Sequence, residues 1–240
     1  MVDKNELHSH YLACEHKIIY ILLMTSAGMM GTYTYVMRGG VFCNAQTANL
    51  VIMSIRFGKG EFSEGLYFFI PITAYFLGTI ISELLPSPVK KLGFLRWDTY
   101  LIGFEIIILF IIGFIPLSWP HHIVQVIVNF IASMQYNTFR QAEGIPMATT
   151  FCTNHVRQIG IACVKVIHKH DCKALNRGIS HFVMIASFFV GGAVLTFSCP
   201  YLAEKTIWIA NIPLIIAFVK LVRADLTIEH DLLSEKPSGH

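Results

Sequence analysis

The sequence contains too few charged residues for a protein that faces water on every side. Asp, Glu, Lys and Arg make up 14% of the 240 residues, whereas a soluble domain carries about 25%. Hydrophobic residues make up 54% of the chain, and its mean hydropathy is +0.58. Apolar runs near the length of about 20 residues that spans a bilayer recur along the sequence. This composition predicts an integral membrane protein.

Sequence features of several other protein classes are also missing. The six cysteines show no C-x-x-C spacing, and the stretches HSHYLACEH and HKHDCK lack a recognised ligand spacing, so we expect neither disulfides nor a metal site. A net charge of +3 without a basic patch gives no reason to expect a nucleic-acid partner. Hydrolase, zinc-protease and nucleotide-loop motifs are absent, so we expect no enzyme activity and no cofactor.

Apolar segments divide the chain into a membrane domain with two polar ends. The ends are residues 1–17, which lack the features of a cleavable signal peptide, and residues 223–240. We expect one all-helical membrane domain over residues 18–222. Its apolar segments are residues 18–36, 41–57, 66–85, 100–117, 123–139, 145–167, 179–198 and 207–222.

The motifs occur in the same order in both halves of this domain. A shift that superposes Gly39 on Gly144 also superposes Asn49 on Asn154. Further along, AYFLGTII at 74–81 resembles SFFVGGAV at 187–194. We therefore predict two sequence-related repeats of four segments, about 18–117 and 123–222.

The loops permit two membrane topologies. If every segment crosses fully, the chain crosses eight times. If the second and sixth segments are re-entrant or broken, the chain crosses six times and the halves form an inverted repeat. The six-crossing arrangement places more Lys and Arg in the cytoplasm, so we favour it. In both arrangements the N- and C-termini are cytoplasmic.

Uncharged hydrogen-bonding residues concentrate in the second and sixth segments and form a stripe at four-residue spacing on the fifth. Interrupted segments at matching positions of two repeats are typical of a transporter's binding site. Amides also join transmembrane helices to one another, so a cavity lining and simple packing both stay open. The candidate substrate-binding residues are Asn44, Gln46, Thr47, Asn49, Gln125, Asn129, Asn137, Thr153, Asn154 and Arg157.

Two ionisable residues and two glycines complete the candidate site. Charges within a membrane segment are costly and tend to be functional, so we expect Arg157 to contact an anionic group and Glu105 to take up a proton. A structural pair between the two is the alternative. Gly39 and Gly144 precede the polar segments and are the candidate hinges.

The stretches GGVFCNAQTANLV and TTFCTNHVRQIG resemble motifs of the YoaK-type family of bacterial multi-pass membrane proteins. Ala48 and Asn154 stand where the family pattern has glycine. The resemblance covers about residues 18–222. It implies a multi-pass protein of the bacterial cytoplasmic (inner) membrane and assigns no substrate.

These patterns together predict a secondary transporter or channel for a small polar or anionic solute, with its site at the interface of the repeats. The alternative is a structural or sensory module whose polar helix faces pack against a partner subunit. The expected partners are membrane lipids, the solute and, as a further option, a second copy of the chain.

Overall fold

The protein is predominantly helical in the part that the structure describes. The computed structural model describes residues 11–90, 93–235 and 237, so residues 1–10 of the predicted N-terminal segment and most of the last five residues lie outside the described part. The chain is 77% helical with almost no sheet, which confirms the all-α prediction. The elements are η1 Ala13–Glu15, α2 Lys17–Met37, α3 Gln46–Gly58, α4 Phe62–Tyr67, α5 Phe69–Leu84, α6 Pro86–Lys90, α7 Trp97–Ile112, α8 His121–Thr138, β1 Gln141–Ala142, β2 Ile145–Pro146, α9 Thr153–Lys169, α10 Cys172–Leu202, η2 Ala203–Ala210, α11 Asn211–Leu226 and η3 His230–Leu232.

The second and sixth apolar segments are helical over only part of their length. Residues 41–45 and 147–152 precede α3 and α9 without regular structure. The remaining helices have 13 and 17 residues, about 20 and 26 Å at 1.5 Å per residue. Both lengths fall short of the roughly 30 Å hydrocarbon core of a bilayer.

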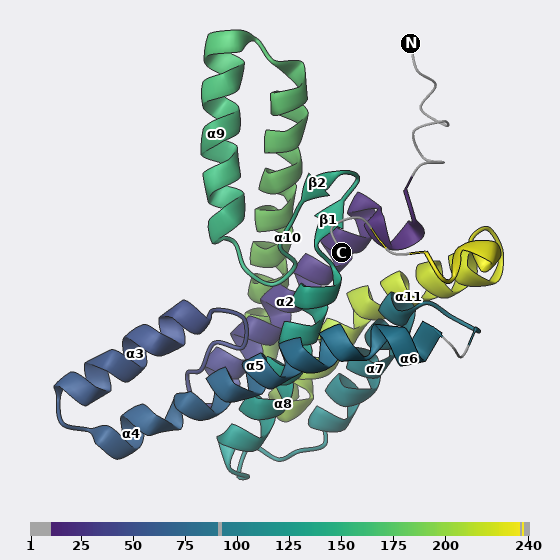
Figure 1. Cartoon of the computed structure of the whole chain (residues 1–240). Helices are drawn as coiled ribbons and strands as arrows, with labels where there is room; N and C mark the ends of the chain where they lie inside the picture. The colour runs from purple at the N-terminus through teal and green to yellow at the C-terminus, as the bar shows by residue number, and fades with distance from the viewer. Residues whose placement is uncertain (1–10, 91–92, 236, 238–240) are drawn as a thin grey trace.

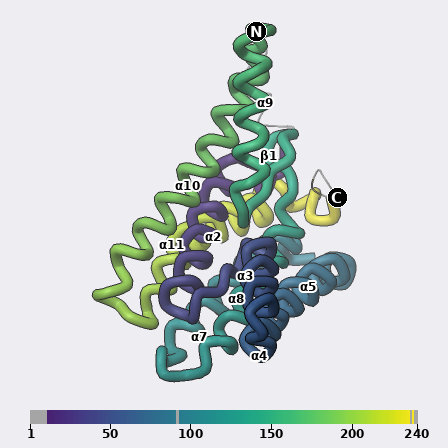
Figure 2. Tube along the Cα trace, turned by 90° about the vertical axis from the view of Figure 1, so that its left-hand side faces the viewer, coloured from purple at the N-terminus to yellow at the C-terminus, as the bar shows by residue number. Residues whose placement is uncertain are grey.

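Each of these short helices belongs to a hairpin that projects from the rest of the molecule. In Figure 1, α3 lies beside α4 at the left and α9 beside the first part of α10 at the top. Figure 2 shows the α9–α10 hairpin from the side, standing clear of the other helices. The two hairpins occupy equivalent places in the order of elements.

The body of the molecule is built from helices exchanged between the halves. The long helix α10 packs along α2, the first helix of the chain, and α5 packs along α8, the first helix of the second half. The final helices of the halves, α7 and α11, also pack on each other. In each half, the first helix therefore has its main packing partner in the other half.

Glycine allows both exchanged pairs to approach closely. A Cβ atom built on Gly191 of α10 would overlap the Thr25 carbonyl oxygen of α2, and one built on Gly78 of α5 would overlap the Phe130 carbonyl oxygen of α8. The glycines occupy matching positions in AYFLGTII and SFFVGGAV, and the shift that superposes Gly39 on Gly144 superposes Thr25 on Phe130. The same contact therefore occurs twice, in the register that the sequence motifs predict.

Two helical runs in the described residues are long and apolar enough to cross a membrane. They are Phe62–Lys90 and Cys172–Leu226, and the second contains both α10 and α11. Only 28% and 22% of their most apolar windows are buried inside the protein. A core helix of a soluble protein would be covered by its neighbours, so these runs give limited support to a membrane location.

A buried charged cluster joins the two ends of the described chain to the start of α7. Arg96 is 2% exposed; its side chain donates to Asp98 at 3.2 Å and to the carbonyl of Leu232 at 3.1 Å. The backbone N–H of Ala13 donates to the Glu229 carboxylate at 2.6 Å. Burial raises the pKa of Glu229. The cluster ties the segment before α2 to the segment after α11.

We predict that Gly78→Ala and Gly191→Ala each lower the free energy of unfolding by about 1–3 kcal/mol, because the added methyl group must displace a helix backbone. Denaturant titration in detergent measures the change. Gly160→Ala in α9 is the matched control, since a Cβ there meets nothing within 4 Å, and alanine should stabilise that helix slightly. Equal stability of all three variants would contradict the close helix crossings.

Candidate functional site

Two hydrogen bonds between Asn49 and the backbone of Phe42 close the loop of the first polar segment. Its Nδ2 donates to the carbonyl of Phe42 at 2.7 Å, and its Oδ1 accepts from the N–H of Phe42 at 3.1 Å. Gly39, a predicted hinge, has a φ of 83°, which lets the chain turn out of α2 ahead of this loop. Asn49 is wholly buried, so it satisfies backbone groups that would otherwise lack water.

Gln46 of α3 and the amides of α8 connect α3 and α4 to α8. Gln46 donates to Asn129 Oδ1 at 2.8 Å and accepts from Asn49 at 3.1 Å. Gln125 accepts from the hydroxyl of Tyr67 at 2.6 Å and donates to the carbonyl of Arg38. The structure therefore brings four of the predicted residues together, but protein groups bond to each of them. This arrangement is the packing alternative that the sequence left open.

Asn44 and Thr47, the other two candidates of this segment, lie apart from that network. Asn44 is buried, and its Nδ2 donates to the carbonyl of Ala27 on α2 at 3.3 Å. Thr47 is exposed in the first turn of α3.

In the second half, His155 closes the equivalent loop. Its Nε2 lies 2.9 Å from the carbonyl oxygen of Ala148, which is seven residues earlier, as Phe42 is seven residues before Asn49. The predicted register superposes Asn49 on Asn154, one residue away. His155 is wholly buried, whereas Asn154 is half-buried. Sequence reasoning gave His155 no role, although it follows Asn154 directly.

His155 also meets a second buried histidine, His181 of α10. Their Nδ1 atoms lie 2.9 Å apart. A carbonyl oxygen can only accept, so Nε2 of His155 carries the hydrogen. In a neutral pair, Nδ1 of His155 then accepts from His181, which leaves Nε2 of His181 as an acceptor. That atom is buried without a partner in the described part of the chain.

The turn ahead of this segment is fixed to the start of α2. Gly144, the second predicted hinge, has a φ of 75° between β1 and β2. The adjacent Glu143 carboxylate accepts from Lys17 Nζ at 2.9 Å and from the Lys17 N–H at 3.2 Å. Partial burial acts to raise the pKa of Glu143, and the contacts with Lys17 outweigh it, so the pKa is lowered.

A pocket of about 510 Å³ opens where α8 ends and α9 begins. Two asparagines from the predicted set line it, and each accepts from an arginine three residues later. Asn137 Oδ1 accepts from Arg140 at 2.9 Å, and Asn154 Oδ1 accepts from Arg157 at 2.8 Å. The lining residues are Tyr136, Asn137, Arg140, Pro146, Met147, Ala148, Phe151 and Asn154.

One arginine lines this pocket, and another lies beside it. Arg140 forms an ion pair with Glu83 at 2.8 Å. Arg157 is exposed beside Asn154 and has no carboxylate partner among the residues that the structure describes. Tyr136 and Phe151 form an aromatic wall, with ring centroids 4.8 Å apart. The lining thus combines amide groups with an aromatic wall, and Arg157 lies next to it through its bond to Asn154.

The remaining candidates lie elsewhere. Thr153 is exposed at the start of α9. Glu105 is wholly buried in α7, and neither of its carboxylate oxygens has a partner among the described residues, so the alternative pairing with Arg157 does not occur. An ionised Glu105 would be an uncompensated buried charge.

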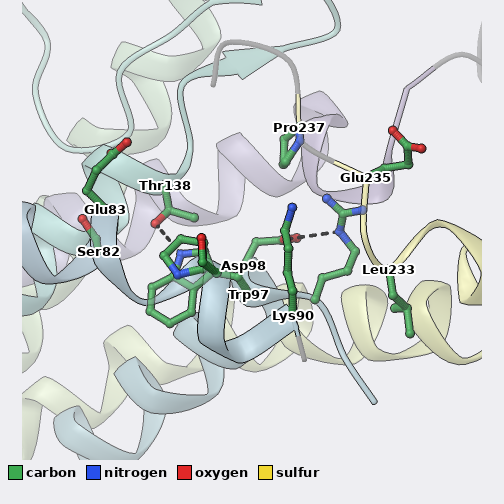
Figure 3. Close-up of a pocket in the computed structure, with 12 residues that line it drawn as sticks. Ser82, Glu83, Lys90, Trp97, Asp98, Thr138, Leu233, Glu235 and Pro237 are labelled. Carbon is green, nitrogen blue, oxygen red and sulfur yellow. Dashed lines mark hydrogen bonds and ion pairs between the residues drawn. The ribbon is translucent and has the colours of Figure 1, made fainter. Parts of the chain in front are cut away.

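A second, smaller pocket of about 140 Å³ lies under the C-terminal tail. Figure 3 shows Lys90, Trp97 and Asp98 around it, with Leu233 on the tail side. Trp97 Nε1 donates to Thr138 Oγ1 at 3.1 Å, and Lys90 donates to the carbonyl of Ser234 at 3.0 Å. The first bond joins α7 to α8 and the second fastens the tail to α6, so this pocket is a weaker candidate than the one at Asn154.

Comparison with protein-family models gives one match. A model described as "Protein of unknown function (DUF1275)" matches residues 19–220. The chain belongs to the DUF1275 family. The match covers both polar segments and both glycine crossings, whereas the YoaK-type name stays a prediction. Searches of curated proteins and of solved structures returned no match.

The two asparagines that the repeat superposes should behave differently in this DUF1275 protein. Asn49→Ala is expected to lower the free energy of unfolding by about 1–3 kcal/mol, because both backbone groups of Phe42 lose their partner. Asn154→Ala removes a half-buried side chain and should change it by less than about 0.5 kcal/mol. Denaturant titration in detergent compares them, and equal losses would contradict the assigned roles.

Proposed function

We propose that this DUF1275 protein is a multi-pass protein of the bacterial cytoplasmic membrane that moves a small anionic solute, as a secondary transporter or channel. The exposed apolar surface supports the membrane location. Phe69, Phe76, Phe189 and Phe197 are each more than half exposed on the two apolar helical runs. Large contiguous apolar surfaces are rare on soluble monomers, and lipid would cover this one.

The exchanged helices support an inverted repeat with six crossings. The α2–α10 and α8–α5 pairs repeat one arrangement, with a matching glycine contact in each. The helices α3 and α9, too short to span a bilayer, are the two broken segments of this proposal. Non-helical backbone at membrane depth is tolerated where it is buried in protein or lines a wet cavity, and residues 42–45 and 147–152 meet that condition. The N- and C-termini remain cytoplasmic in this arrangement.

The pocket at Asn154 is the single observation that carries the proposed solute site. It lies beside a broken segment, and its volume of about 510 Å³ falls within the range of small-molecule sites, about 300–1,000 Å³. In this proposal Arg157, which is bonded to the lining residue Asn154, supplies a positive charge for the solute's anionic group, and the lining residues Tyr136 and Phe151 supply an apolar wall. A small carboxylate with an apolar body has the matching chemistry. Glu105 remains the candidate for proton coupling.

A structural or sensory module is the second candidate function. Its partner could not use Gln125 and Asn129, since α3, α4 and α5 already cover these residues in the same chain. The projecting hairpins are the surfaces that such a partner would contact. A second copy of the chain is one such partner.

We predict that the purified protein, once reconstituted in liposomes, resists extraction with alkaline carbonate. In a swelling assay these liposomes should admit small carboxylates such as sodium acetate or benzoate. Arg157→Gln should lower the rate about tenfold or more, because a charge-assisted contact to the anion is lost. Arg223→Gln, which removes an exposed arginine of α11, is the matched control and should retain the rate. Flux no greater than that of empty liposomes, or full flux in Arg157→Gln, would refute the proposal.

A further inference from the structure

Near the tip of the α9–α10 hairpin lies a further small pocket. The chain reverses there at His170, whose φ is 48°, and α10 begins after Asp171. The pocket has a volume of about 160 Å³ and lies between the second half of α9 and the first turns of α10. The polar residues that line it are Gln158, Lys165, Asp171, Lys173 and Arg177.

The single carboxylate at this pocket is already engaged. Asp171 caps α10, and its Oδ1 accepts from the N–H groups of Lys173 at 2.9 Å and Ala174 at 3.1 Å. These two bonds satisfy backbone N–H groups that have no partner within the first turn of the helix. Asp171 forms no ion pair with a lining cation in the described part of the chain.

The pocket therefore has three cationic side chains and one carboxylate. Lys165, Lys173 and Arg177 have no carboxylate partner within the described residues. In addition, the Nε of Arg177 is buried and makes no hydrogen bond in that part of the protein. Buried donors are almost always bonded in native proteins, so this atom indicates that an acceptor is missing. An anion in the pocket would supply both the acceptor and the charge.

Phosphate is the anion whose chemistry fits these groups. Arginine binds phosphate oxygens through its planar fork, lysines add point charges, and the amide of Gln158 adds a donor. The volume of about 160 Å³ lies below the roughly 300 Å³ at which pockets hold drug-sized ligands. It therefore suits a single tetrahedral group rather than a nucleotide.

We propose that this pocket binds one phosphate group and that a membrane lipid headgroup supplies it. Two features favour the lipid source. The apolar helical run that begins at Cys172 starts beside the pocket, and the opposite face of the hairpin is an apolar groove of about 320 Å³ that includes Ile159, Cys163 and Phe182. The cytoplasmic leaflet is rich in anionic lipid, and each nearby Lys or Arg adds about 1 kcal/mol of attraction. This lipid site is separate from the solute pocket at Asn154.

The test compares two phosphate sources on the full-length protein. Native mass spectrometry and thermal unfolding are measured in neutral detergent with added phosphatidylglycerol, with phosphatidylcholine and with inorganic phosphate. The double variant Lys165→Gln/Arg177→Gln should bind phosphatidylglycerol about tenfold or more weakly. Lys220→Gln/Arg223→Gln removes the same charge from an exposed part of α11 and should bind within about twofold of the unaltered protein.

Each outcome bears on the proposal. Binding of phosphatidylglycerol that only the Lys165/Arg177 variant loses supports the lipid headgroup. Binding of inorganic phosphate alone, with the same dependence, keeps the phosphate site but overturns the lipid source. Equal loss in both double variants, or no loss in either, overturns the site. Arg177→Lys keeps the charge but removes the fork, so intermediate binding by a variant with an unchanged melting temperature separates recognition from folding damage.

Discussion

Close contact between glycines and backbone carbonyls of the opposite half is the constraint on which the structure depends. Gly191 lies against Thr25, and Gly78 lies against Phe130. These crossings place α10 of the second half on α2 and α5 of the first half on α8. The chain between those helices must then turn and start a new helix beside the body. The interrupted segments before α3 and α9 lie in these connections.

Each interrupted segment needs side chains to bond its free backbone groups, and the two halves supply different ones. Gln125 of α8 holds the carbonyl of Arg38, while the residue at its place in α2, Tyr20, bonds the backbone of Gln141 at 2.7 and 2.8 Å. Asn129 pairs with Gln46, but its counterpart in α2 is Met24, which has no amide to offer. The first half is therefore closed by amide pairs. The second leaves room for a pocket at Asn154.

The sequence was sufficient to predict the helical class and to align Gly78 with Gly191, which both lie at close helix crossings. These features depend on hydrophobic runs and on small residues that admit close packing, and both can be recognised locally. It was also sufficient to group Gln46, Asn49, Gln125 and Asn129. It could not separate amides bonded within the protein from amides that line a pocket, because that distinction depends on which residue of the facing helix lies opposite. His155 was missed because the residue that bonds the loop in the second half lies one position after Asn154, which the repeat superposes on Asn49.

The exchange of helices between the halves is tested most directly by producing residues 1–117 and 118–240 as separate chains. In a half produced alone, the first helix lacks the helix on which it packs in the whole protein. We therefore expect neither chain to accumulate as a folded monomer alone, and both to co-purify as an equimolar complex when they are produced together. Two separately folded, stable chains with no affinity for each other would contradict the account.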